Sequence, residues 1–240
     1  MKRLSTFLIT TSLCFFSTLN LQAQDIGFSD NSEPKKKLYL TTGIDGYLLS
    51  SSSLKTPNQT AALTTPRFTM FLHIGGLAHY DFTNNVGMFL GLGLKNLGFI
   101  EKYNDSDLTT IRRTYNIGIP LALKFGNLRG NGTYFMVGGG VDFPIHFKEK
   151  TFTKRSSKTK EGEWFSNRTE QVMPYVFVGA RFKPGVTIKA QYYTGNFMNT
   201  DFVGSSTLPN SVSNGKPYAG YEVHTFLLSL GVDLRMKAKY

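Results

Sequence analysis

The sequence predicts an all-β fold, an eight-stranded antiparallel up-and-down transmembrane β-barrel, from three observations. Residues 115–125 alternate between large apolar residues at odd positions and small, polar or charged residues at even positions, as in a strand with two unlike faces. Seven further stretches repeat this division, and no helical stretch is available to cover their apolar faces. The connections alternate between long polar loops and tight turns, which is typical of membrane-spanning barrels.

The N-terminus has the pattern of a secretory signal peptide. Lys2 and Arg3 precede an apolar run over 7–16, and Ala23 supplies a small residue at the expected cleavage site. The run is about half of the roughly 20 residues that a spanning helix needs. We therefore predict a signal peptide over 1–23, a periplasmic N-terminal extension over 24–37 and the barrel over 38–240.

Composition excludes several classes of function. Cleavage would leave 240 − 23 = 217 residues with a formal charge of +11 − 2 = +9, and the cations are spread over strands and loops instead of forming one block. Anionic lipid head groups are therefore expected neighbours, and nucleic acid is not. The single cysteine, Cys14, lies in the signal, so the mature chain has no thiol chemistry. No catalytic, metal or phosphate-binding motif occurs, and we predict no catalytic residue, metal or cofactor.

The strands are assigned in chain order from their alternation. They are expected over 38–48, 67–82, 86–100, 115–125, 135–147, 172–182 and 186–196, with a last strand that ends at Tyr240. Long loops are expected over 50–66, 101–113, 148–170 and 197–217, and tight turns at 84–85, 126–132 and 184–185. A break in phase at 97–99 indicates a bulge in the third strand.

The alternation of loops and turns also predicts an orientation. Short turns are periplasmic and long loops extracellular in outer-membrane barrels, so both termini should be periplasmic. A soluble barrel of lipocalin type is the alternative, with its apolar residues inside. That alternative would place eight charged residues on the outer surface, namely Asp45, Lys95, Lys124, Asp142, Arg181, Lys189, Asp233 and Arg235.

In the membrane-spanning reading, the same eight residues face inward and form a structural polar lattice. The interior of an eight-stranded barrel is only wide enough for side chains, so charges placed there must be paired. Lys124, Lys189 and Arg181 are expected to pair with Asp45, Asp142 or Asp233. His73, His79 and His146 fall on the same inward phase, where they superficially offer metal ligands or acid–base pairs; the lattice is the simpler interpretation.

The last strand carries an insertion signal. Phe226 and Leu234 share the outward phase on which the terminal Tyr240 also falls, which resembles the signal that barrel-insertion machinery recognises in bacterial outer-membrane proteins. With the Leu-Gln-Ala-Gln signal end and the strand pair over 115–140, the chain resembles the PorT-like outer-membrane β-barrel families of Bacteroidota, often labelled porin family. The resemblance implies fold and outer-membrane location more than activity.

The function expected from these observations is that of a monomeric outer-membrane barrel with a structural, surface-interaction or assembly-accessory role and no diffusive pore. A lipid A-modifying enzyme is the alternative, because His224 falls on the outward phase, but Ser229 is about 17 Å away along the strand and cannot be its catalytic partner. A small-solute porin is the third candidate.

Loop cations indicate the expected partners. Five of them are expected to contact lipopolysaccharide phosphates or a surface partner: Lys150, Lys154, Arg155, Lys158 and Lys160. Glu161 and Glu163 in the same segment weaken this expectation.

Overall fold

The computed structural model describes residues 38–57, 59–103, 108–129, 132–153, 157–204 and 215–235. The predicted signal peptide, the N-terminal extension and Tyr240 lie outside these ranges. The described residues form ten strands: β1 (Leu38–Thr56), β2 (Gln59–Leu63), β3 (Arg67–Asp81), β4 (Val86–Tyr103), β5 (Leu108–Gly126), β6 (Tyr134–Thr153), β7 (Ser157–Trp164), β8 (Met173–Phe182), β9 (Val186–Tyr193) and β10 (Glu222–Arg235).

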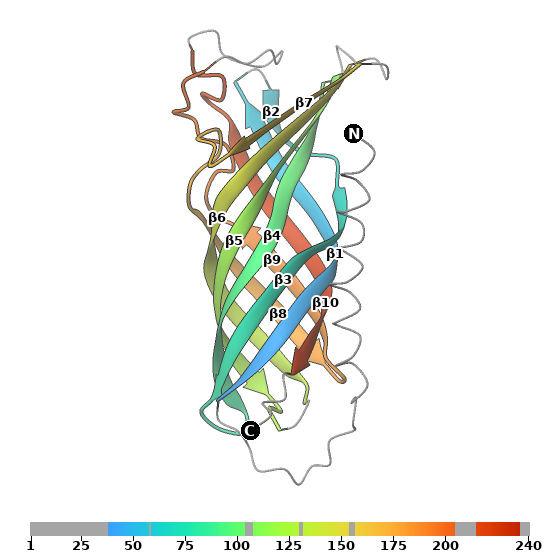
Figure 1. Cartoon of the computed structure of the whole chain (residues 1–240), viewed down its shortest axis with the longest axis vertical. Coiled ribbons are helices and arrows are strands. Elements are labelled where there is room, and N and C mark those ends of the chain that lie inside the picture. The colour runs from blue at the N-terminus through green and yellow to red at the C-terminus, as the bar shows by residue number, and fades with distance from the viewer. Residues whose placement is uncertain are drawn as a thin grey trace, which may run out of the picture. The chain divides into compact units, whose positions relative to one another are not determined.

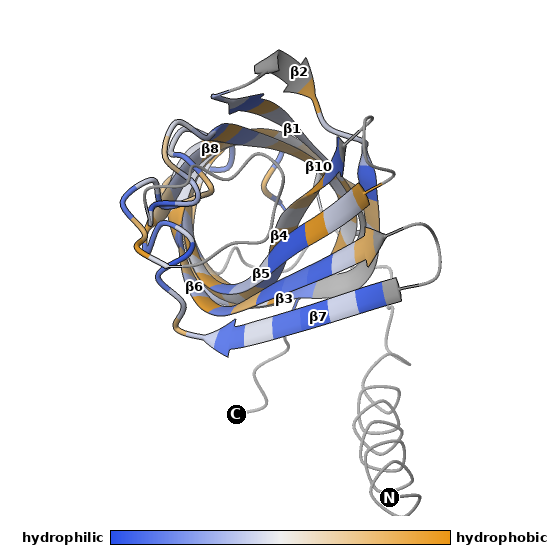
Figure 2. Ribbon diagram, turned by 90° about the horizontal axis from the view of Figure 1, so that it is seen from above, coloured by the Kyte–Doolittle hydropathy of each residue, from blue (hydrophilic) through white to orange (hydrophobic). Residues whose placement is uncertain are grey.

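Eight of these strands form a closed ring. Antiparallel pairing runs in the order β1-β3-β4-β5-β6-β8-β9-β10, and β10 pairs with β1 to close the sheet. The remaining two, β2 and β7, pair only with β1 and β6 and lie outside the ring (Figure 2). The predicted eight-stranded antiparallel barrel is therefore confirmed. Among the described residues, no helix is long and apolar enough to cross a membrane.

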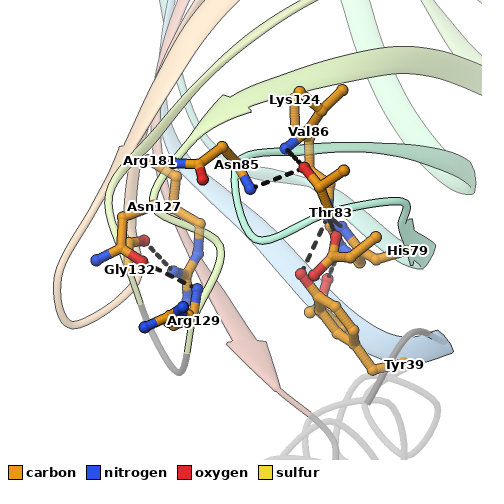
Figure 3. Close-up of polar contacts among 12 residues, drawn as sticks. Tyr39, His79, Thr83, Asn85, Val86, Lys124, Asn127, Arg129, Gly132 and Arg181 are labelled. Carbon is orange, nitrogen blue, oxygen red and sulfur yellow. Dashed lines mark hydrogen bonds and ion pairs between the residues drawn. The ribbon is translucent and has the colours of Figure 1, made fainter. Parts of the chain in front are cut away.

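The two ends of the barrel differ in their connections. At one end, here called the turn end, short connections join β3 to β4, β5 to β6 and β8 to β9. At the opposite end, here called the loop end, β5, β6 and β7 extend beyond the ring (Figure 1). Thr83 organises the first turn, because its Oγ1 accepts hydrogen bonds from the Asn85 and Val86 amides at 3.1 and 2.9 Å (Figure 3). Among the described residues, only Phe165 and four glycines have a positive φ, so this turn does not use the left-handed region that its asparagines tolerate.

Alternation decides which side chains enter the lumen. Along β5, the even positions Arg112, Asn116 and Lys124 are fully buried, whereas Ile117 and Leu121 point outward and are exposed. The other ring strands divide in the same way: their charged residues point inward, together with aromatic side chains such as Phe89 and Phe177, and the outer face is apolar. This is the inverse of a soluble protein.

Register shifts change the phase of two strands. Between Asp45 and Tyr47 the pairing of β1 shifts, and the inward positions change from odd to even numbers. A second shift, opposite Tyr115 and Asn116, turns His146 outward and buries Phe147. The predicted inward position of His146 is therefore wrong, because a bulge residue exchanges the two faces of a strand.

The predicted bulge at 97–99 is also wrong. β4 pairs with β5 in unbroken register, and Leu97 and Phe99 keep the inward phase and are buried. The irregularity lies at the start of β3 instead: between the bridges Thr65↔Ile100 and Ile74↔Leu94, nine residue steps from Thr65 into β3 face six of β4. The Ser50 hydroxyl donates to the Gly98 carbonyl at 3.0 Å in this region.

Three predicted loops are largely strand. The expected loop over 50–66 contains the end of β1 and all of β2, that over 101–113 contains the ends of β4 and β5, and that over 148–170 contains the end of β6 and β7. β9 is shorter than predicted and ends at Tyr193. β6 has 20 residues, whereas about 9–11 residues are enough to cross a bilayer. Hydrophobic alternation therefore identified only the part of such long strands that lies toward the turn end.

Candidate functional site

The middle of the lumen holds two adjoining ion-paired groups, together called the middle cluster: Asp45, His73, Lys95, Asp142, Lys189 and Tyr193. Asp142 Oδ1 lies 2.9 Å from Lys95 Nζ, and its Oδ2 accepts a hydrogen bond from Tyr193 Oη at 2.5 Å. The Lys95 ammonium also lies over the Tyr175 ring, 3.7 Å from its centroid. These contacts give each charge a partner of opposite sign, as burial requires.

Asp45 organises the other half of the middle cluster. Its Oδ2 lies 2.8 Å from Lys189 Nζ and 3.5 Å from His73 Nδ1. Lys189 thus pairs with one of the aspartates predicted for it, whereas Lys124 does not, as shown below.

A row of glycines provides room for the middle cluster. Gly43, Gly75, Gly93 and Gly118 are direct partners across four adjacent strands, and all occupy inward positions. A Cβ on Gly118 would lie 2.5 Å from Asp142 Oδ1 and 2.8 Å from Lys95 Cε. The row leaves bare backbone on one wall of the lumen.

A cavity of about 70 Å³ lies between this row and the middle cluster. Three polar atoms of its lining residues are buried and have no hydrogen-bond partner within the described part of the chain, namely His73 Nε2, Tyr175 Oη and Gln191 Oε1. A water needs roughly 10–15 Å³ and a benzene-binding cavity is about 150 Å³, so this cavity is suited to hydrating polar groups.

Lys124 organises a second group, the turn-end cluster. Its Nζ lies 2.6 Å from Asp81 Oδ1, donates to Tyr39 Oη at 3.1 Å and approaches His79 Nδ1 at 3.2 Å (Figure 3 shows Lys124, His79 and Tyr39). Lys124 therefore pairs with Asp81 and not with one of the three predicted aspartates. The stacked Tyr39 and His79 rings complete the group.

His79 in this cluster cannot act as a base toward its neighbour Thr41. Thr41 Oγ1 lies 2.9 Å from His79 Nε2, a distance typical of a nucleophile and base. The ammonium of Lys124 can only donate, so Nδ1 must accept and Nε2 carries the proton. The tautomer assigned from this network leaves no lone pair to take the threonine proton, and the contact is structural.

The remaining predicted lattice residues lie around the turn end. Arg181 Nη1 donates to the Gly132 carbonyl at 3.2 Å, and its Nη2 approaches the Asp233 backbone carbonyl at 3.5 Å. Arg235 lies over the Tyr39 ring, 4.3 Å from its centroid. The eight lattice residues are thus distributed over two levels of the barrel.

A third group, the loop-end cluster, was not predicted. Arg112 is fully buried between Glu101 and Glu149, and its Nε donates to Glu149 Oε2 at 2.7 Å. Its guanidinium lies near the rings of Phe99 and Tyr218. The inward position of Arg112 was not predicted, because the residues around it were assigned to a loop.

Three segments contact the loop-end cluster through Phe197 and Tyr218 and are together called the loop-end cap: 165–172, 194–204 and 215–221. The Phe197 amide donates to the Val223 carbonyl at 2.9 Å, and Asn196 Nδ2 donates to the Tyr221 carbonyl at 2.8 Å. Phe197, Met198 and Tyr221 are almost fully buried. The cap therefore packs as an apolar core over the ion pairs.

Three of the five predicted surface cations, Lys150, Lys158 and Lys160, lie on the paired strands β6 and β7. Lys150 and Lys160 are direct partners across β6 and β7, and Lys158 faces Phe152 in the same ladder. Lys154 and Arg155 lie outside the described residues. Glu161 and Glu163 occupy alternate positions on the opposite face, where Arg168 lies 3.7 and 3.5 Å from their carboxylates.

The two residues weighed for lipid chemistry lie on different faces of β10. His224 is half-buried and stacks on Tyr192 with ring centroids 6.3 Å apart. Ser229 is buried on the inward phase. Within the described residues, no group of three or more His, Cys, Asp or Glu could hold a metal ion.

No protein-family model matches the chain, and no curated protein matches it. Several solved outer-membrane barrels are similar in fold. Ail of Yersinia pestis, solved with the heparin analogue sucrose octasulfate, is 15% identical, covering 83% of this chain and 100% of its own, with a TM-score of 0.37. Neisserial surface protein A is 12% identical and covers 85% of this chain and 100% of its own, with a TM-score of 0.40. OprG of Pseudomonas aeruginosa is 13% identical and covers 83% of this chain and 98% of its own, with a TM-score of 0.32. These values are low, so the fold rests on this chain's own strand pairing.

Proposed function

We propose that this protein is a monomeric bacterial outer-membrane β-barrel of the PorT-like type that its sequence resembles, with a structural or surface-interaction role and no diffusive pore. The outward face carries this proposal. Large apolar side chains stand exposed around the ring, such as Leu92 at 60% and Phe135 at 64%. A soluble monomer rarely exposes a continuous apolar band, whereas lipid covers one without cost.

The height of the apolar band fits a bilayer. On β5, outward residues from Phe125 to Ile117 are apolar, and Tyr115 ends the series just below Arg113. Tyr115 and Phe125 are ten residues apart, which matches the 9–11 residues of a tilted spanning strand. The short connections of the turn end support a periplasmic position for that end and for both termini.

The packed lumen supports a role other than solute diffusion. The turn-end, middle and loop-end clusters fill three successive levels, and their charges are held in ion pairs. Phe197 and Tyr218 of the loop-end cap pack against Phe99 and Arg112 of the uppermost level. Aqueous channels belong to barrels of about 16 strands, whereas about eight leave room only for side chains.

Cell fractionation and gel mobility test the proposal together. The mature chain should sediment with urea-washed outer membranes, and unboiled samples should migrate differently from boiled ones, because a closed ladder resists detergent until heated. Recovery from the soluble periplasm would contradict the membrane placement and favour the lipocalin-type alternative. No observation favours the lipid A-modifying enzyme, since His224 and Ser229 face opposite sides of β10.

A further inference from the structure

Charges of opposite sign are separated onto the two faces of β4–β7 at the loop end. The outward positions carry six cations, here called the cation face: Lys102, Arg113, Lys148, Lys150, Lys158 and Lys160. The acids of the same strand segments, Glu101, Glu149, Glu161 and Glu163, all occupy inward positions. Residues that face one another in a ladder share one side of the sheet, so pairing assigns the faces directly.

The register places like charges against each other on the cation face. Arg113 is the direct partner of Lys148, and Lys150 is the direct partner of Lys160. Like charges directly opposite in a sheet are destabilising. The Arg113 guanidinium lowers the pKa of the partly buried Lys150 ammonium, and burial and the neighbouring lysines add to this effect. A bound anion would therefore stabilise the cation face.

Arg113 provides a second, independent indication. Its Nε is buried and has no hydrogen-bond partner within the described part of the chain. No ion pair joins a member of the cation face to an acid among the described residues. The planar donors of a guanidinium match the geometry of phosphate oxygens, and a lipid phosphate would reach the buried Nε once the Arg113 side chain turns toward it.

The position of the cation face identifies the source of the anion. Tyr115, His146 and Trp164 are successive partners across β5, β6 and β7, and the last two rings lie with centroids 4.3 Å apart. Trp164 is 66% exposed, and such aromatic girdles mark the interface of a bilayer. Arg113 and Lys148 follow two residues further out, about 7 Å beyond the girdle, which is the level of lipid head groups.

From these observations we propose that the cation face binds the phosphate groups of lipid A in the outer leaflet. The proposal rests on the proposed outer-membrane placement and names the lipid that the surface would hold. Arg113, Lys148 and Lys150 form the lower part of the site, nearest the girdle, and Lys160 lies opposite Lys150 on β7. The Lys148 ammonium lies over the Tyr115 ring, 5.3 Å from the ring centroid, so its charge sits beside the girdle.

A charge-matched pair of variants provides the test. The site variant carries Lys148→Gln, Lys150→Gln and Lys160→Gln, and the control carries Lys55→Gln, Lys183→Gln and Lys216→Gln, so both lose three positive charges. Two of the control lysines have an exposed acid partner, Glu222 for Lys55 and Asp201 for Lys216, and none lies on the cation face. Each detergent-solubilised barrel is titrated with bis-phosphorylated lipid A and with lipid A that lacks both phosphates.

We expect the site variant to bind bis-phosphorylated lipid A at least about tenfold more weakly than the wild type and the control. The phosphate-free lipid should bind weakly to all three. Because a ligand stabilises the state that binds it, bis-phosphorylated lipid A should raise the unfolding temperature of the wild type and control only. Without lipid, the site variant should be no less stable than the wild type, because its like-charge contacts are gone.

Two failures remain distinguishable in the same samples. A wild type without heat-dependent gel mobility would overturn the proposed function itself. A wild type that forms the barrel but binds phosphate-free lipid equally well, or a site variant that binds like the control, would overturn the phosphate site and leave the outer-membrane barrel standing.

Discussion

Lys95 and Asp142 form an ion pair in the middle of the lumen, with Nζ 2.9 Å from Oδ1. The carboxylate side chain is fully buried, and its second oxygen is held by Tyr193. Because the lumen is polar and dense, this pair and its neighbours determine whether the barrel is stable and whether it is open.

Replacing Asp142 by Ala should destabilise the barrel by about 3–5 kcal/mol, because Lys95 would remain as a buried charge without its main partner. Urea unfolding of the protein in detergent micelles, followed by gel mobility, measures the change. Lys55→Gln is the control, since its pair with Glu222 is exposed to solvent and contributes little to stability. Equal losses in the two variants would argue against an essential middle cluster.

Gly118→Ala should destabilise the barrel by about 1–3 kcal/mol, because the added methyl group would displace the Lys95–Asp142 pair. Gly76→Ala is the matched control: Gly76 lies in the same kind of strand but faces outward, and an added Cβ would contact nothing within 4 Å. The same unfolding measurement applies to both. If Gly118→Ala were as stable as Gly76→Ala, the glycine row would not be needed for packing.

Cysteine labelling should establish the orientation, since the only natural cysteine lies in the predicted signal peptide. An impermeant maleimide should label Thr159→Cys on exposed β7 in intact cells. It should label Asn85→Cys, in the exposed turn between β3 and β4, only after the outer membrane is opened. The reverse pattern would mean that the turn end faces outward.

Hydrophobic alternation predicted the part of the barrel that has one apolar and one polar face. On β5, the residues from Tyr115 to Phe125 were assigned to the correct faces, because each outward position is apolar. His146 was misplaced because the register shift that reverses the faces of β6 has no signature in its own residues. Which side chains point inward beyond a bulge depends on the pairing with the neighbouring strand, and a single sequence does not show that pairing.

The strand extensions at the loop end escaped prediction for a different reason. Their two faces differ in the sign of charge and not in hydrophobicity, so a search for apolar alternation assigns them to loops. The signal was present in Lys148, Glu149 and Lys150, where the sign alternates with period two. The partners of Lys124 and Arg112 were equally hidden, since both depend on which strands lie across the lumen.

Ion conductance of the purified wild-type monomer in a planar bilayer tests the central claim most directly. A lumen occupied by three paired clusters and by large aromatic side chains such as Phe89 and Phe177 should carry little or no steady current at any moderate voltage. Reproducible, voltage-stable conductance in the nanosiemens range would contradict the account. It would mean that the lumen is open and that the protein is a diffusive porin.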